Sequence, residues 1–140
     1  MTFRARSSSV SLQRAIVKAV RGEGLNVWDG TNQAPEYPFI KIGEELSSGL
    51  SVSKDAVGKT HNLTIHIWSD YPSSMETKMI SDFLVDLLVH SSLEIGDGFC
   101  LSEASLDHVR YSEASNGTRK LYRAYLFLDF EVVDTLINPA

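Results

Sequence analysis

The sequence predicts an α+β domain in which two helices pack on one face of a mostly antiparallel sheet of four or five strands. Two segments place apolar residues three and four positions apart, which is the spacing of an amphipathic helix. Other segments alternate polar and apolar residues one by one, as half-buried strands do. Because the segments follow in the order helix, strands, helix, hairpin, the pattern indicates an α+β domain.

Length and composition are those of one folded domain. The 140 residues are 43% hydrophobic and 22% charged, close to the average of soluble globular proteins. We expect a flexible arm at 1–9, a single domain at 10–135 and a short tail at 136–140. No run approaches the roughly 18 apolar residues of a membrane span, and the arm lacks the apolar core of a secretory signal. We therefore expect the chain to be made in the cytoplasm and to have no membrane partner.

Charge and cysteine content exclude further classes. The net charge of −5 means that the whole molecule repels nucleic acid unless a local basic face compensates. The single cysteine, Cys100, cannot form an internal disulfide, and free cysteines are usually buried. We expect Cys100 to be a buried strand residue.

The first predicted helix covers residues 10–21. Its apolar residues lie near one another at helical spacing: Val10, Leu12, Ala15, Ile16, Ala19 and Val20. Gly22 and Gly24 end it, as glycines do at helix C-termini. We interpret the basic residues on its other side as a solvated face, with contact to nucleic acid or to an acidic partner as the alternative.

A short strand in LNVW and a second from about Phe39 to Glu45 follow, and the proline-rich segment between them is held extended. The second strand alternates Phe39, Lys41 and Gly43 against Ile40, Ile42 and Glu44. From Leu46 to Gly58 the sequence is rich in serine and glycine and has weak periodicity, which predicts a long mobile connection. Loops of this length often carry function.

The stretch HNLTIHIWSDY, residues 61–71, predicts a strand that contains two histidines. Alternation places His61 on the same side as Leu63, and His66 on the opposite side with Trp68. The two imidazoles therefore cannot bind the same metal ion, and we interpret both as surface or half-buried side chains. No pair of histidines in the chain has ligand spacing, so no metal site is predicted.

The second predicted helix runs to His90. Ser73-Ser74-Met75-Glu76 has the order of a capping box. The apolar residues that follow repeat at three and four positions and are expected in the core: Met79, Ile80, Phe83, Leu84, Leu87 and Leu88.

A hairpin completes the predicted sheet. Its strands are FCLSEASLDHVRYSEAS and KLYRAYLFLDFEVVD, with Asn116-Gly117 as the central residues of the turn between them. Trp68, Tyr125 and Phe127 fall on the strand face opposite the most apolar one. We expect helices to cover these aromatic side chains, or else another subunit to contact them.

The sequence contains no motif that predicts catalysis or cofactor binding. Neither glycine-rich stretch has the order of a phosphate-binding loop, and no serine lies in a glycine-flanked elbow before a helix. Glu44 and Glu45 fall on opposite strand faces, so they do not form a facing carboxylate pair.

Three motifs, in this order, resemble a known family. A proline and an aromatic residue open a strand that ends in Ile-Gly, a strand that ends in Trp-Ser precedes the second helix, and Thr-Arg opens the last strand. The residues are Pro38, Phe39, Ile42, Gly43, Ile67, Trp68, Ser69, Thr118 and Arg119. Over residues 10–133 the pattern is similar to small tail-completion, or tail-terminator, proteins of long-tailed bacteriophages, prophages and gene transfer agents. Pro72-Ser73-Ser74 before the second helix and the final LINPA depart from it.

The resemblance implies a structural protein of the virion tail-neck region, made in the host bacterial cytoplasm. Its copies would form a ring, commonly of six, that caps the tail tube, stops its growth and joins it to the head connector. DNA would pass through the ring without sequence-specific binding, and neither a cofactor nor a metal is implied. Candidate contacts with neighbouring copies or the tail tube protein are Leu46, Leu50, Val52, Lys54, Asp55, Trp68, Tyr125 and Phe127. The alternatives are a head-side neck adaptor or stopper protein and a small α+β enzyme or ligand-binding domain.

Overall fold

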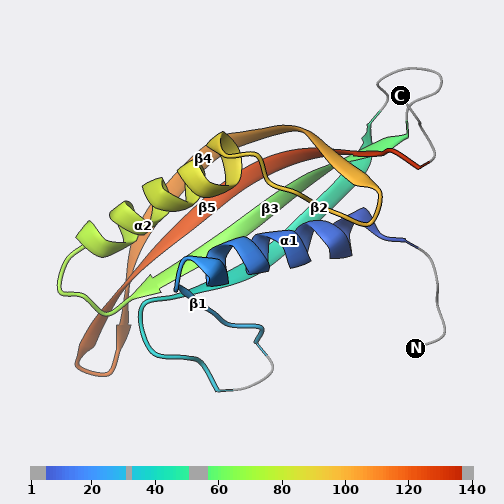
Figure 1. The fold of residues 1–140 in the computed structure, drawn as a ribbon. Helices are drawn as coiled ribbons and strands as arrows, with labels where there is room; N and C mark the ends of the chain where they lie inside the picture. Colours follow the sequence, from blue (N-terminus) through green and yellow to red (C-terminus); the bar gives the residue numbers. More distant parts are fainter. Residues whose placement is uncertain (1–5, 31–32, 51–56, 137–140) are drawn as a thin grey trace.

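The computed structural model describes residues 6–30, 33–50 and 57–136, and for Leu50 and Asn116 it describes the backbone alone. The elements are α1 (Ser8–Gly22), β1 (Asn26–Val27), β2 (Phe39–Leu50), β3 (Gly58–Ser69), α2 (Met75–Val85), the π-helical turn η1 (Asp86–His90), β4 (Phe99–Asn116) and β5 (Arg119–Asp134). Both helices lie on one face of a twisted sheet (Figure 1). The predicted α+β class is confirmed.

The sheet has five strands in the order β1-β2-β3-β5-β4. The four long strands are antiparallel to their neighbours, whereas β1 pairs in parallel with the start of β2. The sheet is therefore mixed, with one short parallel strand at its edge. The face without helices, called the open face below, carries residues from β2, β3, β4 and β5.

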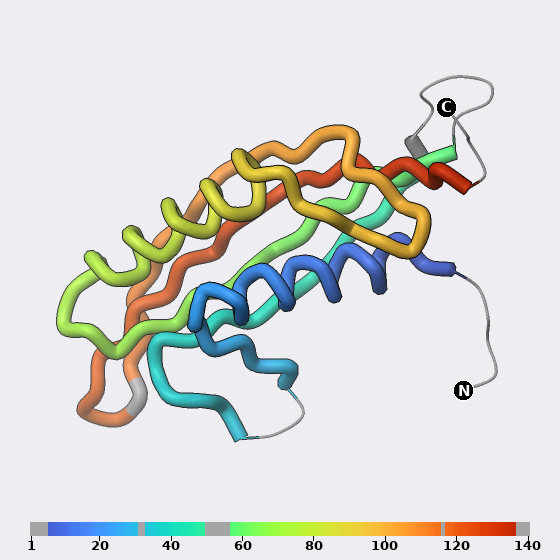
Figure 2. The backbone as a smooth tube through the Cα atoms, in the orientation of Figure 1, coloured from blue at the N-terminus to red at the C-terminus, as the bar shows by residue number. Residues whose placement is uncertain are grey.

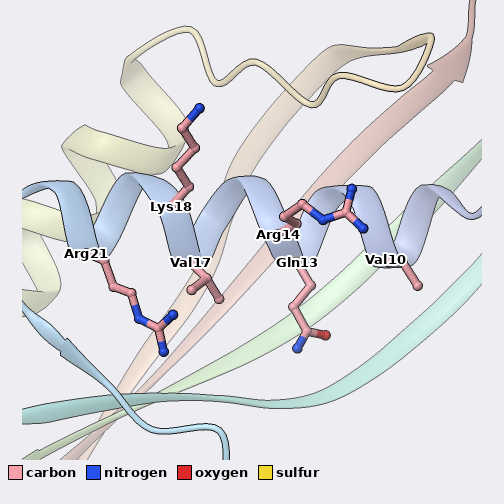
Figure 3. Close-up of a pocket in the computed structure, with 6 residues that line it drawn as sticks. All are labelled: Val10, Gln13, Arg14, Val17, Lys18 and Arg21. Atoms are coloured by element: carbon pink, nitrogen blue, oxygen red, sulfur yellow. The ribbon is translucent and has the colours of Figure 1, made fainter.

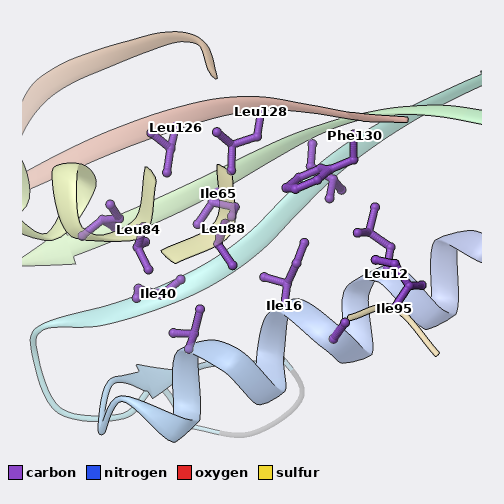
Figure 4. Close-up of a cluster of buried hydrophobic side chains, with 14 of the residues drawn as sticks. Leu12, Ile16, Ile40, Ile65, Leu84, Leu88, Ile95, Leu126, Leu128 and Phe130 are labelled. Carbon is purple, nitrogen blue, oxygen red and sulfur yellow. The ribbon is translucent and has the colours of Figure 1, made fainter. Parts of the chain in front are cut away.

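The core lies between the helices and the sheet. Leu12 and Ile16 of α1 meet Ile65 of β3 and Phe130 of β5, all at most 1% exposed (Figure 4). The alternation predicted for β5 is confirmed, because Leu126, Leu128, Phe130 and Val132 are all buried.

Helix α1 begins two residues before the prediction. The Ser7 hydroxyl accepts a hydrogen bond from the backbone N–H of Val10, which is the usual N-cap contact. Val10 was expected in the core but is 54% exposed, and Ser8 and Ser11 are buried in the first turn. The reason is helical geometry, since Val10 lies on the side of the helix away from Leu12 and Ile16.

Helix α2 differs from its prediction in two respects. The α-helix ends at Val85 and the chain continues as η1 to His90. Met79 and Phe83 were expected in the core but are 65% and 42% exposed, whereas Leu84 and Leu88 are fully buried. Only one side of the apolar stripe faces the sheet. On that side of α2 the small side chains of Thr77 and Ser81 are buried, which lets the helix approach the sheet closely.

The predicted capping box is not formed. Ser74 is the N-cap of α2 and makes no side-chain cap bond. The carboxylate of Glu76 instead accepts a hydrogen bond from the buried Ser69 hydroxyl, at 2.6 Å. A tertiary contact with the end of β3 thus replaces the local one.

The described residues of the predicted connection from Leu46 to Gly58 are largely strand. β2 continues to Leu50, and its residues from Leu46 onward pair with Gly58 to Asn62 of β3. The polar composition of this end reflects exposed side chains, because the backbone groups are satisfied by pairing with β3. Residues 51–56, which include the candidates Val52, Lys54 and Asp55, lie outside the described residues.

Two smaller expectations for the strands are also wrong. Cys100 lies on the edge strand β4 and is exposed. The hairpin turn is centred one residue later than predicted, because Asn116 pairs with Arg119. Gly117 therefore takes the positive φ, 68°, that the turn requires.

The start of α1, the end of β5 and the Leu50–Gly58 end of the paired strands β2 and β3 lie at the same end of the molecule (Figure 2). Arg6 binds the Asp134 carboxylate at 2.6 Å and the Asp97 carbonyl at 2.9 Å. The Asp134 N–H donates to the carbonyl of Val57 at 3.0 Å. These bonds connect segments that are far apart in the sequence.

Candidate assembly surface

The open face carries a cluster of stacked aromatic rings and arginines. Trp68 on β3 lies opposite Arg123 on β5, and the Arg123 guanidinium carbon is 3.4 Å from the Trp68 ring centre. Arg123 also donates to the Tyr125 hydroxyl at 2.5 Å, and the Arg110 guanidinium carbon lies 4.6 Å from the Tyr125 ring centre. We call Trp68, Arg110, Arg123 and Tyr125 the arginine–aromatic cluster.

This cluster alters the acidity of its tyrosine. Burial opposes ionisation of Tyr125, but hydrogen bonds with Arg123 and Ser112, and the nearby charges of Arg123 and Arg110, lower the pKa of Tyr125 below its ordinary value.

A second group of rings extends the cluster toward β1. Phe39, although on the open face, is only 4% exposed. Its ring centre lies 5.7 Å from that of Trp28, 5.2 Å from that of Tyr37 and 6.2 Å from that of Trp68. Lys41 adds a cation 4.9 Å from the Trp28 ring centre. The loop between β1 and β2 therefore covers Phe39 and leaves Trp68 at the border of the covered region.

The other half of the open face is acidic and hollowed. A depression of about 440 Å³ lies at the candidates Leu46 and Phe127 and is bordered by the carboxylates of Glu44, Asp107 and Asp129. Leu46 is 68% exposed at its rim. The open face is thus basic and aromatic at one end and acidic at the other.

The structure divides the predicted contact residues into two groups. Trp68 and Tyr125 share the arginine–aromatic cluster, and Leu46 and Phe127 share the acidic hollow, where the Phe127 ring stacks on His108 at 4.2 Å. Both helices cover the opposite face, so neither helix covers these aromatic side chains (Figure 1). Arg123 was not among the predicted residues, but its spacing of two from Tyr125 placed it on the same strand face.

On the helix-covered face, a polar network that is buried at Ser8 and His61 and exposed at Glu45 and Ser47 joins α1 to the β2–β3 hairpin. His61 is fully buried, which corrects the expected surface or half-buried position. Its Nε2 lies 3.0 Å from the Ser8 hydroxyl, and its Nδ1 lies 3.0 Å from the Ser47 hydroxyl and 3.3 Å from a Glu45 carboxylate oxygen. The Ser9 hydroxyl donates to the same Glu45 oxygen at 2.6 Å.

A β-bulge between Ile42 and Glu45 brings Glu45 into this network. The extra residue shifts the alternation, so that Glu45 faces His61 while Glu44 contacts His66 on the open face. Glu44 therefore does not share a face with Ile40 and Ile42, as the alternation predicted. Glu44 and Glu45 do point to opposite faces of the sheet, as expected. Burial raises the pKa of Glu45, but hydrogen bonds from Ser47, Ser9 and His61 outweigh it and lower the pKa below its ordinary value.

The order Ser8, His61, Glu45 is that of a hydrolytic triad, but the surroundings favour a structural joint. Ser8 is only 7% exposed, and the cavity beside it measures about 110 Å³, below the usual range of ligand sites. Nδ1 of His61 is also shared with Ser9 and Ser47. Among the described residues, no group of three or more His, Cys, Asp or Glu side chains could hold a metal ion.

Comparison with known proteins decides the family. Residues 10–133 match the family described as tail completion protein gp17. The chain belongs to this family. The family consists of structural phage proteins, which confirms the predicted resemblance and the prediction that the chain is not an enzyme.

Solved structures share the fold of this tail completion protein. A chain in the virion of a native gene transfer agent particle has a TM-score of 0.76 and 18% identity, over 92% of this chain and 99% of that chain. The gp17 protein of bacteriophage SPP1 has a TM-score of 0.54 and 18% identity, over 93% of this chain and 95% of that chain. A sequence search of curated proteins gave no match. In the part of the tail completion protein that is described, no helix is long and apolar enough to cross a membrane.

The motif residues of this tail completion protein have identifiable structural roles. A Cβ atom at Gly43 would lie 2.4 Å from Nε2 of His66, so glycine lets His66 pack against β2. The Ser69 hydroxyl binds Glu76 at the start of α2, and Arg119 binds the Asp70 carboxylate at 2.5 Å. One residue of each motif thus has a structural role: Gly43 allows close packing at the bulge, and Ser69 and Arg119 bind side chains of the connection to α2.

The outer sides of the two helices are also exposed in this tail completion protein. Along α2, three apolar side chains at intervals of four residues, Met75, Met79 and Phe83, are 57%, 65% and 42% exposed. Along α1, the described residues that line a hollow of about 630 Å³ all belong to that helix (Figure 3): Val10, Gln13, Arg14, Val17, Lys18 and Arg21.

Proposed function

We propose that this protein is a tail terminator whose copies form a ring, six in number, on the end of the tail tube. The ring stops tube growth and joins the tube to the head connector in the tail-neck region of the virion. The observation that carries the proposal is the family match, which spans residues 10–133. The similar fold of a chain in a gene transfer agent virion supports the location.

Uncovered surfaces support assembly as the mode of action. The arginine–aromatic cluster leaves large rings and guanidinium groups only half-buried in a single copy. Tryptophan, tyrosine and arginine are the residues that contribute most to protein interfaces. We propose that Trp68 and Tyr125 contact a neighbouring copy of the chain.

The free edges and the far end of the sheet supply further contact regions. β4 forms one edge, and among the described residues β2 beyond the short β1 has no strand paired on its outer side. The unpaired backbone groups of an edge strand can pair with another chain. We propose that the end of the β2–β3 hairpin, from Leu46 to Gly58 and including Leu50, Val52, Lys54 and Asp55, contacts the tail tube protein or the next subunit.

Charge suits a channel through which DNA moves. The net charge of −5 and the acidic hollow with Asp107 and Asp129 disfavour tight phosphate binding, because affinity for DNA comes mainly from cations that neutralise phosphates. DNA would thus slide through the ring without sequence-specific binding.

Electron microscopy of particles from a producer strain that lacks this gene tests the proposal. We expect over-long or unjoined tails beside filled heads, and restoration by the intact gene. Tails of normal length that fail to join would indicate a neck stopper, whereas normal joined particles would exclude both structural roles.

A Trp68→Ala variant tests the proposed contact in the same strain. We expect a protein that folds, by circular dichroism, but does not restore joined particles. Tyr71→Ala is the matched control, because Tyr71 is an exposed aromatic residue, 45% accessible, outside the open face. Loss of folding in Trp68→Ala would assign Trp68 to stability and not to assembly.

A further inference from the structure

The outer side of α2 is an apolar row bordered by acidic side chains. Met75, Met79 and Phe83 are spaced by four residues and lie opposite the buried side of the helix. Asp82 and Asp86 fall on the same outer side, because positions three and four apart are neighbours on a helix surface. The exposed Lys78 lies on this side too, with its ammonium near the Tyr111 ring of β4. We call Met75, Met79, Asp82, Phe83 and Asp86 the α2 stripe.

The outer side of α1 has the complementary character. Val10 and Val17 are apolar and lie seven residues apart, about two helical turns. Arg14, Lys18 and Arg21 surround them and are all exposed. We call these five residues, with the hollow of about 630 Å³ that they line with Gln13, the α1 face.

The two surfaces cannot meet within one chain. Val10, Val17 and Arg21 extend from α1 on the side turned away from α2, whereas Lys18 extends toward α2 (Figure 3). Arg21 also donates to the carbonyl of Val27 in β1, at one edge of the sheet, at 3.3 Å. On α2, Lys78 lies 5.6 Å from the ring centre of Tyr111 in β4, at the other edge. The α1 face and the α2 stripe therefore belong to different sides of the molecule.

We propose that the α2 stripe of one copy docks on the α1 face of the next copy in the ring. This inference rests on the proposed ring and specifies one of its subunit contacts. The occupant is a second copy because the same chain supplies both an acidic apolar row, from Met75 to Phe83, and a basic apolar row of similar length, from Val10 to Val17. A contact between two different surfaces is heterologous, which is the type that closes into a ring when the rotation between copies allows it.

Side-chain chemistry supports this pairing. Methionine is flexible and fills irregular gaps, so Met75 and Met79 suit the shallow hollow beside Val10 and Val17. Asp82 and Asp86 would face Lys18 and the arginines, and these opposite charges fix the relative orientation of the two helices. Contact between two α2 stripes is disfavoured, because their aspartates would repel each other. Arg14 already forms an ion pair with Asp97 at 3.1 Å, whereas the hydrogen bond of Arg21 to the Val27 carbonyl at 3.3 Å involves no opposite charge, so Lys18 and Arg21 are the better positions for a charge reversal.

Charge reversal tests the contact in particles, where the tail tube is present. The double variant K18E/R21E and the double variant D82K/D86K should each lose joined particles, because like charges then face each other. The combined fourfold variant should regain them, and misfolded halves could not produce such a rescue. Lys120→Glu, an exposed reversal at the start of β5 and outside the proposed contact regions, is the matched control and should assemble normally.

Cross-linking supplies a direct readout. In a Cys100→Ser background, Val17→Cys and Met79→Cys in the same chain should give a ladder of covalent oligomers in purified particles treated with a short bismaleimide. Val17→Cys with Lys120→Cys, at the start of β5, should not. Complete particles that contain the protein but show no ladder, together with normal assembly of both reversals, would overturn this contact and leave the terminator function intact. Normal particles without the gene would refute the terminator function itself, and the contact with it.

Discussion

Replacing His61 by alanine should lower the free energy of unfolding by about 3–5 kcal/mol. The imidazole is fully buried, and truncating a buried side chain of similar size costs about 2–5 kcal/mol. The Ser8 hydroxyl, 7% exposed, would lose its contact with Nε2, and an unsatisfied buried hydroxyl costs about 1–3 kcal/mol. Because the vacated site is polar, water can partly replace the ring, which keeps the total below the sum of the upper limits.

Urea unfolding followed by tryptophan fluorescence measures this loss. With a dependence on urea of about 2 kcal/mol per molar, the midpoint should fall by roughly 2 M. His90→Ala is the control, since His90 is exposed at the end of η1 and its loss should change stability by no more than about 0.5 kcal/mol. Equal midpoints for the two variants would refute the conclusion that the network around His61 holds α1 on the β2–β3 hairpin.

Three further outcomes follow from the open face and the polar network. Gly43→Ala should lower the free energy of unfolding by about 1–3 kcal/mol, because its Cβ would lie 2.4 Å from Nε2 of His66. Gly49→Ala should be nearly neutral, because no described atom outside its two chain neighbours would lie within 4 Å of the added Cβ, and equal urea midpoints for the two variants would contradict the packing argument. The pKa of Tyr125 is below its ordinary value of 10.0, so its ionisation stabilises the fold fully above that pH and the contribution disappears as pH falls through the folded pKa. Tyrosinate absorbance against pH should show one early titration that Tyr125→Phe removes. The pKa of Glu45 is below 4.5, so the stability it supplies is present above that pH and is lost as pH falls through the folded pKa. Glu45→Gln should flatten the acid limb of the urea midpoint against pH, and an unchanged slope would argue against the network.

The predicted helices and strands agree best with the structure where the sequence shows a strong helical or strand period. Helix α1 and strands β3 and β5 appear close to where they are predicted, because each buries one side and each shows the corresponding period over at least ten residues. The β2–β3 hairpin is longer than predicted, since the β2 residues from Leu46 to Gly49 are exposed and no apolar face marks that part of the strand. Pairing partners, which a single segment does not reveal, define such a strand.

The candidate surface was only partly predictable. Alternation placed Trp68, Tyr125 and Phe127 on one face, and the structure confirms that the helices lie on the other. The stacking of Arg123 on Trp68 depends on the register of β3 against β5, which alternation alone does not give. The exposure of Met79 and Phe83 was missed because helical spacing shows that residues share a side, but not how wide a side the sheet covers.

The sequence by itself determined the α+β class, the faces of the long strands, the absence of catalytic motifs and the family resemblance. These depend on residues close in the chain, on composition and on the order of motifs. Only the tertiary structure decided the bulge that brings Glu45 to the buried His61, the arginine–aromatic cluster and the exposed outer sides of α1 and α2. Each of these depends on which strands pair, in what register, and on which side of a helix the sheet lies, and long-range packing fixes all three.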